Sequence, residues 1–378
     1  MKRRLLYVHS STDLYGSDRS LLRMVAGVGE EYDVTVAVPT AGPLVPELRA
    51  RGAAVRVLPL TVVRRGVRPQ DAFGAWSRGL AATAALVREV RPDLVHSNTL
   101  AVTDGALAAW LLGVPHVWHV REYIVQPAAF RPVMATLAAI TSRVVVANSL
   151  PVAQWFAGGG PLRPRVRVIH NGLEYADVQP RPVAAVEPGR PLTAVLMARI
   201  NAWKGHGLLI RALASLPPAE RDLLRVVFAG DVFPGNEHVE AELCAEAARL
   251  GVSRHVEWRG FVPDPGRVLA DADVLVVASE TPEPFGNVML EAMEVGLPVV
   301  ATAHGGPLDV VVEEVTGLLV PPQPEALAAA LVRLAGDADL RRRMGAAGWR
   351  RARTVFSQRR TTAALLALYT DVIGGYGR

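Results

Sequence analysis

Short apolar runs alternate with longer amphipathic stretches along the whole chain. In the first half these runs are apolar on both faces, which is typical of strands in a parallel sheet that helices cover. Helical periodicity lies between them, for example over residues 20–28 and 80–90. The alternation predicts an α/β fold. The strands predicted in this half are residues 5–8, 34–38, 55–58, 94–96, 116–120, 144–147 and 166–169.

A proline-rich segment over residues 173–191 interrupts the pattern and predicts a linker, because it contains Gln179-Pro180-Arg181-Pro182 and shows no periodicity. The alternation then restarts, and the chain ends in a helical pattern over residues 358–372. We expect two similar α/β halves with a ligand crevice between them. The second half has predicted strands at 194–197, 226–229, 256–258, 274–277 and 299–301, and predicted helices at 206–215, 237–250, 287–295 and 324–335.

Composition narrows the class of protein. The chain has 378 residues, of which 50% are hydrophobic, so it can build two or three packed domains and is not disordered as a whole. The net charge of +5 suits an anionic small molecule or an anionic membrane surface better than nucleic acid. A single cysteine, Cys244, excludes an intramolecular disulfide and a thiolate metal site.

Targeting signals are weak. The apolar run at residues 5–8 is too short for a signal peptide, and the longest apolar candidate, residues 107–120, is broken by Gly113 and Pro115. We therefore expect a soluble, cytoplasmic protein, with peripheral contact at the inner face of the membrane left open.

The most informative segment runs from Glu283 to Glu291. Pro284 and Gly286 place Glu283 in a loop, and a helix then begins at about Gly286. Backbone amides at a helix start favour a phosphate, and a carboxylate such as Glu291 can accept two hydrogen bonds from a ribose diol. The alternative is that Glu283 is a surface residue and that Glu291 only stabilises the helix start.

Arg199 and Lys204 form a second candidate, because two cations just after a predicted strand can neutralise a diphosphate. The alternative is a solvated basic loop. The chain contains neither GxxxxGK[ST] nor GxGxxG, so nucleotide hydrolysis and a dinucleotide cofactor lack motif support.

Three further segments carry polar residues at predicted strand ends. Gly16 would let the backbone approach a ligand, unless its loop is an ordinary helix start capped by Ser17 or Asp18. His119 and Glu122 could face the crevice, although a single strand histidine is more often a packing residue. The pair of aspartates at residues 271 and 273 resembles a metal–diphosphate ligand, but we interpret it as a structural turn.

Together these segments resemble the retaining glycosyltransferases of the GT-B fold, in the large nucleotide-sugar family four, over essentially the whole chain. The strongest part is the family's E-x7-E element, here Glu283 to Glu291. The supporting parts are Arg199 with Lys204-Gly205, and residues 170–172, 228–231 and 260–263.

The resemblance implies an α/β, GT-B architecture of two Rossmann-like parallel-sheet domains with an interdomain cleft. Residues 1–172 would form the acceptor-side domain and residues 192–355 the nucleotide-sugar-binding domain. Residues 356–378 would form a helix that packs back toward the first domain.

The resemblance also implies roles for single residues. Arg199 and Lys204 would bind the donor diphosphate, and Glu291 the ribose. Glu283 would contact the transferred sugar, and His119 would lie near the anomeric carbon, so these two are the candidate catalytic residues. The remaining donor-binding candidates, several of them through backbone atoms, are Gly16, Phe261, Val262, Phe285, Gly286 and Asn287.

Two positions depart from the family pattern. Tyr15 precedes a single Gly16 where the family often has two glycines, so close backbone approach is expected only at Gly16. Ala198 stands where a glycine often precedes the phosphate-binding arginine.

The implied activity is retaining transfer of a sugar from a UDP- or GDP-sugar to an acceptor hydroxyl, without an obligatory metal or other cofactor and without nucleic acid. The expected acceptor is lipid-linked or a polysaccharide, and the alternative is a secondary metabolite such as an aminoglycoside precursor. A sugar-nucleotide epimerase or hydrolase, or a non-catalytic sugar-nucleotide-binding protein, also remains open. The basic loop at residues 64–68 would meet acceptor or lipid headgroups, or is only a solvated face.

Overall fold

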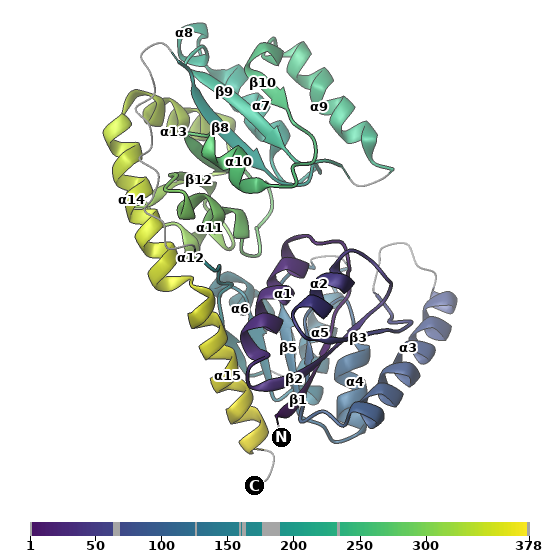
Figure 1. The fold of residues 1–378 in the computed structure, drawn as a ribbon. Helices are drawn as coiled ribbons and strands as arrows, with labels where there is room; N and C mark the ends of the chain where they lie inside the picture. Colours follow the sequence, from purple (N-terminus) through teal and green to yellow (C-terminus); the bar gives the residue numbers. More distant parts are fainter. Residues whose placement is uncertain are drawn as a thin grey trace. The chain divides into compact units, whose positions relative to one another are not determined.

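A computed structural model describes residues 2–62, 69–124, 127–158, 160, 164–175, 190–232 and 235–375. The chain folds into two compact units (Figure 1). The first unit comprises residues 1–174 and 358–378, and the second comprises residues 175–357. Most of the predicted linker and the basic segment 64–68 lie outside the described residues.

The first unit is built on a parallel sheet whose strand order is β3-β2-β1-β4-β5-β6-β7. Its strands are β1 (Arg3–Val8), β2 (Tyr32–Val38), β3 (Ala54–Val57), β4 (Leu94–Ser97), β5 (His116–Val120), β6 (Val144–Ala147) and β7 (Val166–Val168). Its helices are α1 (Gly16–Val28), α2 (Leu44–Ala50), α3 (Pro69–Val90), α4 (Asp104–Leu111), α5 (Phe130–Thr141), α6 (Leu150–Ala157) and α15 (Gln358–Gly374). The chain leaves β1 toward β2 and later returns to β4 on its other side, so the order of strands reverses between β1 and β4.

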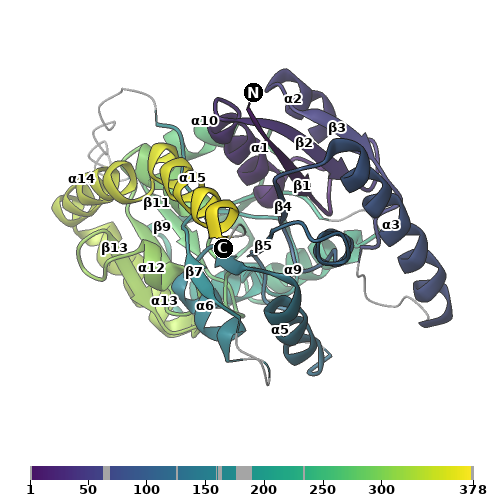
Figure 2. The same ribbon diagram turned by 90° about the horizontal axis from the view of Figure 1, so that it is seen from below.

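The C-terminal helix α15 belongs to this first unit, where it packs against α1 (Figures 1 and 2). A Cβ added to Gly27 of α1 would lie 2.1 Å from the hydroxyl oxygen of Thr362, so the two helices meet closely. Tyr369 is fully buried, and its hydroxyl lies 2.8 Å from that of Tyr7 and 2.7 Å from Nδ1 of His96. The last helix therefore closes the core of the first sheet.

The second unit has a parallel sheet of order β10-β9-β8-β11-β12-β13. Its strands are β8 (Leu192–Met197), β9 (Leu224–Ala229), β10 (Val256–Trp258), β11 (Val274–Val277), β12 (Val299–Thr302) and β13 (Gly317–Val320). Its helices are α7 (His206–Ser215), α8 (Pro218–Arg221), α9 (Glu237–Arg249), the 3-10 turn η1 (Ser253–His255), α10 (Pro265–Ala270), α11 (Asn287–Glu294), α12 (Pro307–Val310), α13 (Pro324–Gly336) and α14 (Ala338–Val355). The strand order reverses between β8 and β11.

Local sequence explains several helix starts. Ser149 accepts a hydrogen bond from the amide of Val152 at the start of α6, and Asp337 accepts one from Leu340 at the start of α14. Asp264 does the same for Gly266 in α10. These side chains satisfy amides that the first helical turn leaves without a carbonyl partner.

The predicted α/β fold is confirmed, and each predicted strand is present with small shifts at its ends. The structure adds β13, which the hydrophobic pattern did not predict because its apolar run is short and lies between Gly317 and Pro321. The interpretation of residues 271–273 as a turn is also confirmed. Asp273 accepts two hydrogen bonds from Arg190 and one from the amide of Thr193.

Within the described parts of the chain, every helix is too short or too polar to cross a bilayer. The longest apolar stretch, residues 107–120, divides between the end of α4 and strand β5.

Candidate functional site

The second unit places its candidate residues where its strand order reverses. In open parallel sheets, ligands bind beyond the carboxyl ends of the strands at such a point. Here the segments that follow β8 and β11 touch each other. Gly205 has φ +80°, and a Cβ on it would lie 1.8 Å from the carbonyl oxygen of Ala278. Only glycine fits this contact, which brings Lys204 next to the loop after β11.

Lys204 and Glu283 form an ion pair at this point. The ammonium Nζ of Lys204 lies 2.5 Å from Oε2 of Glu283 and 4.1 Å from the ring centroid of Trp203. The side chains are only 20% and 9% exposed. The hydroxyl of Ser279 donates a second hydrogen bond to the same carboxylate oxygen. The alternatives of a solvated lysine and a surface Glu283 are therefore wrong.

The segment after β12 holds the loop that carries Glu283. The carbonyl of Glu283 accepts a hydrogen bond from the amide of Gly306 (2.6 Å), and a Cβ on Gly305 would lie 2.3 Å from the same carbonyl oxygen. Thr302 donates to the carbonyl of Ser279, which also lies 2.6 Å from Nε2 of His304. Glu283 thus occupies a fixed position before any ligand arrives.

Helix α11 begins directly after this loop. Gly286 is its N-cap with φ +82°, as expected from the sequence. Phe285 buries its ring against Phe356 at a centroid distance of 6.0 Å, so its backbone is the part suited to ligand contact. Asn287 and Glu291 are half-buried on α11. The amides of this first turn and the helix dipole create a positive region beside Lys204.

The remaining candidates of the second unit lie at neighbouring strand ends. Arg199 follows β8 and is half-buried. The amide of Gly230, after β9, donates to the carbonyl of Gly260, after β10, and a Cβ on Gly230 would lie 2.0 Å from the carbonyl oxygen of Ala198. Phe261 is exposed and Val262 is half-buried. One edge of the sheet therefore carries all the donor-binding candidates of this unit.

His206, the first residue of α7, is buried beside this edge. Both ring nitrogens lack a partner among the described residues, and the ring lies 5.0 Å from that of Phe228. Burial, assisted by the charge of Lys204, lowers the pKa of His206 to about 4. The folded protein therefore keeps this imidazole neutral, whereas an unfolded chain protonates it below about pH 6.5.

We expect the His206→Leu variant to resist acid better than the wild type. Because the folded pKa is depressed, the wild type loses stability as the pH falls from about 6.5 to about 4, which amounts to about 2 kcal/mol at pH 5. Denaturant unfolding of both proteins at pH 5 and pH 7.5 measures the difference. His206→Gln, which stays polar and does not titrate, should show the same flatter profile. Equal pH dependence in all three proteins would contradict the assignment.

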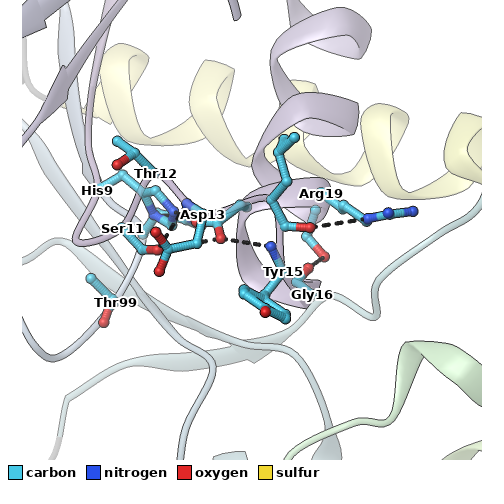
Figure 3. Close-up of polar contacts among 12 residues, drawn as sticks. His9, Ser11, Thr12, Asp13, Tyr15, Gly16, Arg19 and Thr99 are labelled. Atoms are coloured by element: carbon cyan, nitrogen blue, oxygen red, sulfur yellow. Dashed lines mark hydrogen bonds and ion pairs between the residues drawn. The ribbon is translucent and has the colours of Figure 1, made fainter. Parts of the chain in front are cut away.

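The first unit gathers polar residues after β1. Nε2 of His9 lies 2.6 Å from Oδ1 of Asp18, and both side chains are buried. Figure 3 shows His9, Ser11 and Tyr15 in this region of the first unit. The other oxygen of Asp18 accepts hydrogen bonds from the amide of Tyr15 (2.9 Å) and from the hydroxyl of Ser11 (3.3 Å). Asp18 thus fixes the start of α1, which agrees with the alternative that it caps this turn.

Gly16 differs from the expectation for a loop glycine. It is the exposed first residue of α1, and the left-handed backbone of this loop falls on Leu14, with φ 68°. The guanidinium Nε of Arg19 donates to the carbonyl of Leu14 and holds this conformation. A role for Gly16 in phosphate binding stays a prediction.

Arg121, directly after β5, is the centre of a buried network that the sequence did not reveal. Its guanidinium donates to Oδ1 of Asn98 (2.8 Å), to Oδ1 of Asn171 (2.8 Å) and to the sulfur of Met24. Burial lowers its pKa to about 10, so it remains a cation at neutral pH. The remaining contact of this guanidinium is to His119, with 3.3 Å between Nη2 and Nδ1.

His119 is fully buried on β5. Burial, together with the nearby Arg121 and His96, lowers its pKa well below the usual value, so the imidazole is neutral. Because Arg121 donates to Nδ1, the proton of the neutral ring is on Nε2. That Nε2 has no partner among the described residues.

The carboxylate of Glu122 is engaged by hydrogen bonds within the first unit. One carboxylate oxygen accepts hydrogen bonds from the hydroxyl of Thr99 and the amide of Leu100, both at 2.6 Å. The other oxygen accepts from the amide of Arg121. Glu122 therefore ties the end of β5 to the loop after β4.

The network around Arg121 left one signal in the sequence. His9, Asn98 and Arg121 each lie directly beyond a strand of the first sheet, the position at which parallel sheets bind ligands. Which of them meet depends on the strand order. The described part of the chain contains no group of three or more His, Cys, Asp or Glu arranged to hold a metal ion.

Both units resemble known protein families. Residues 182–351 match the family Glycosyl transferases group 1, and residues 15–176 match Glycosyltransferase Family 4. A D-inositol 3-phosphate glycosyltransferase of Saccharomonospora viridis is 32% identical over 86% of this chain and 81% of its own. D-inositol 3-phosphate glycosyltransferase 1 of Catenulispora acidiphila is 31% identical over 94% and 90% of the two chains.

Two solved structures share the architecture. Anabaena HepE in complex with UDP has a TM-score of 0.82 at 24% identity and covers 98% of this chain and 100% of its own. Sucrose-phosphate synthase of Thermosynechococcus elongatus has a TM-score of 0.77 at 20% identity, with coverage of 99% and 100%. These likenesses confirm the predicted GT-B fold.

Proposed function

Because this chain belongs to the group 1 glycosyltransferases of family 4, we propose that it transfers a sugar from a UDP- or GDP-sugar to an acceptor hydroxyl with retention of anomeric configuration. The observation that carries the proposal is the pairing of Lys204 with Glu283 beside the start of α11. Cleavage of a sugar–diphosphate bond builds negative charge on the leaving oxygens. A half-buried ammonium and a helix start are suited to stabilise that charge.

The residue roles that we propose are those that the family resemblance implies. Lys204, with Arg199, binds the diphosphate, and Glu283 contacts the transferred sugar. These cations take the place of a metal, so we propose that no obligatory metal is needed. His119, with its proton on Nε2, offers a neutral hydrogen-bond donor near the anomeric carbon. Without an evident nucleophile, retention implies front-face attack by the acceptor hydroxyl.

A solved structure with a similar fold supports the proposed nucleotide-sugar donor. Anabaena HepE has been solved with UDP-glucose, and that structure is 25% identical to this chain with a TM-score of 0.81. Among the proposed contacts, Phe261 and Val262 line the base pocket, the backbone of Phe285 to Asn287 meets phosphate and sugar, and Gly16 approaches the phosphate from the first unit.

For the acceptor, we propose a lipid-linked or polysaccharide glycan. A small phosphorylated polyol is the second candidate, because the relatives that match most of the chain are named D-inositol 3-phosphate glycosyltransferases. Incubation with a radiolabelled donor and either inositol 3-phosphate or a lipid extract separates the two, and the anomeric proton coupling of the product tests retention.

We expect one nucleoside diphosphate to raise the melting temperature of the purified protein. A ligand at about 100 times its dissociation constant stabilises the folded state by about 2.7 kcal/mol.

Glu291→Ala should weaken binding of the nucleoside diphosphate about tenfold, since it removes hydrogen bonds to the ribose diol. Glu294→Ala, one turn further along α11, is the matched control and should bind as the wild type does. No stabilisation by UDP, GDP, ADP or TDP would contradict the proposed donor site.

A further inference from the structure

Three helices of the first unit present apolar side chains to solvent. The most exposed are Trp110 (53%) and Leu111 (59%) on α4, and Val133 (61%) and Ile140 (52%) on α5. Leu150 of α6 is about half exposed. We call these five residues the α4–α6 patch. Because α4 packs against α5 and α5 against α6, their outer faces adjoin, and Figure 2 shows α5 and α6 neighbouring each other.

The spacing shows that this exposure is not a fraying helix end. On α5, Val133 and Ile140 are two turns apart and lie on one outward side, while half-buried Leu137 between them packs against the core. The opposite side of the same helix, with Met134, Ala135 and Ala138, packs into the core. A helix with apolar residues on both sides of its axis is expected where a second apolar medium covers it.

The charges around the patch are of one sign. Residues 105–173 contain six arginines and a single acidic residue, Glu122, whose carboxylate is engaged by Thr99, Leu100 and Arg121. Of these arginines, Arg121 is buried and Arg167 pairs with Asp371, and the aspartate that begins α4, Asp104, is buried. Arg131 lies in the first turn of α5, and exposed Arg143 lies just beyond its end. The patch therefore combines apolar side chains with flanking cations and no competing carboxylate on the described surface of its helices.

A second apolar group provides the contrast. Leu308 and Val315 of the second unit are similarly exposed, at 49% and 51%. Their chain neighbours are Asp309, Glu313 and Glu314, of which Glu314 pairs with Arg333, so the local charge does not favour an anionic surface. Exposed apolar side chains alone are common, and the sign of the surrounding charge distinguishes the α4–α6 patch.

We propose that the α4–α6 patch docks the protein onto an anionic phospholipid surface. Bilayers supply hydrocarbon for Trp110, Leu111, Val133 and Ile140, and anionic headgroups for the flanking arginines. Tryptophan is favoured at this boundary because its ring is apolar and its N–H is polar. A second copy of this chain would bring arginines against arginines, so self-association is disfavoured. The inference does not depend on the proposed sugar transfer.

Vesicle sedimentation with the full chain tests the proposal. The wild type should bind vesicles containing about 30% phosphatidylglycerol at least about ten times more tightly than pure phosphatidylcholine, and 0.5 M salt should weaken that binding. The Val133→Asp/Ile140→Asp variant should lose about tenfold or more of the affinity, because it removes apolar contact and adds like charge to the surface. Leu308→Asp/Val315→Asp, with the same substitution at similarly exposed positions, is the matched control and should bind as the wild type does.

The outcomes are distinct. Unchanged melting temperatures of both variants would show that exposed positions were altered without unfolding the protein. Absence of wild-type binding to anionic vesicles, or equal binding by the patch variant and its control, would overturn the proposal. A concentration-dependent dimer in sedimentation equilibrium that the Val133→Asp/Ile140→Asp variant loses would instead assign the patch to self-association.

Discussion

Replacing Lys204 with alanine is expected to reduce sugar transfer about a thousandfold, because it removes the half-buried cation that faces the leaving diphosphate. The measurement is the rate of nucleoside diphosphate release in the presence of acceptor. The variant also leaves the Glu283 side chain, which is only 9% exposed, without its ammonium partner. Lys204→Gln keeps a hydrogen-bond donor for Glu283 without the charge, so it should remain folded and still be inactive.

The small number of lysines provides a control for this prediction. The chain has 41 lysines and arginines, of which only Lys2 and Lys204 are lysines. Lys2 is exposed and donates to the carbonyl of Gly29, so Lys2→Ala should transfer sugar at the wild-type rate. An amine-specific label located by peptide mass spectrometry should react less at Lys204 when the nucleotide is bound. Near-normal turnover of Lys204→Ala would refute the phosphate assignment.

His119→Ala is expected to lower turnover about a hundredfold while donor affinity changes little. The side chain is neutral, and Arg121 directs its proton to Nε2, so the variant loses one oriented donor rather than a charge. Steady-state kinetics gives turnover, and nucleotide titration gives affinity. Equal losses of both, in a folded variant, would place His119 in ground-state binding instead.

The same strand offers a matched histidine. His116 starts β5, is equally buried, and hydrogen-bonds to Ser142 and Ser97. Burial lowers its pKa to about 3, so it too is neutral. His116→Ala should lower the melting temperature and leave the turnover of the folded protein unchanged. If His119→Ala behaves in the same way, the packing interpretation of His119 is correct.

The local signals in the sequence were reliable where short-range physics decides the structure. Double-sided apolar runs predicted the strands, since strands covered by helices on both faces must be apolar throughout. Gly286 predicted the start of α11, because a positive φ at a helix cap requires a residue such as glycine. The run at β13 was too short to be separated from its flanking Gly317 and Pro321.

The pairings depended on strand order, which no local pattern encodes. Lys204 meets Glu283, 79 positions away, because β8 and β11 are neighbours and Gly205 lets their loops touch. Arg121 meets Asn171 across 50 positions for the same kind of reason. The sequence nominated Lys204 and Glu283 separately. Of the network around Arg121 it nominated His119 and the segment 170–172 that contains Asn171, but not Arg121 itself.

By itself, then, the sequence determined two α/β halves, their strands, and the segments that carry the candidate site, because burial, helix capping and glycine conformations act over a few residues. Only the tertiary structure decided that Lys204 is paired, that Glu122 is engaged by Thr99 and Leu100, and that Tyr369 of the last helix reaches His96 across 273 positions. Those contacts arise from the order in which strands and helices pack, so their hydrogen bonds and charges exist only once the sheets have formed.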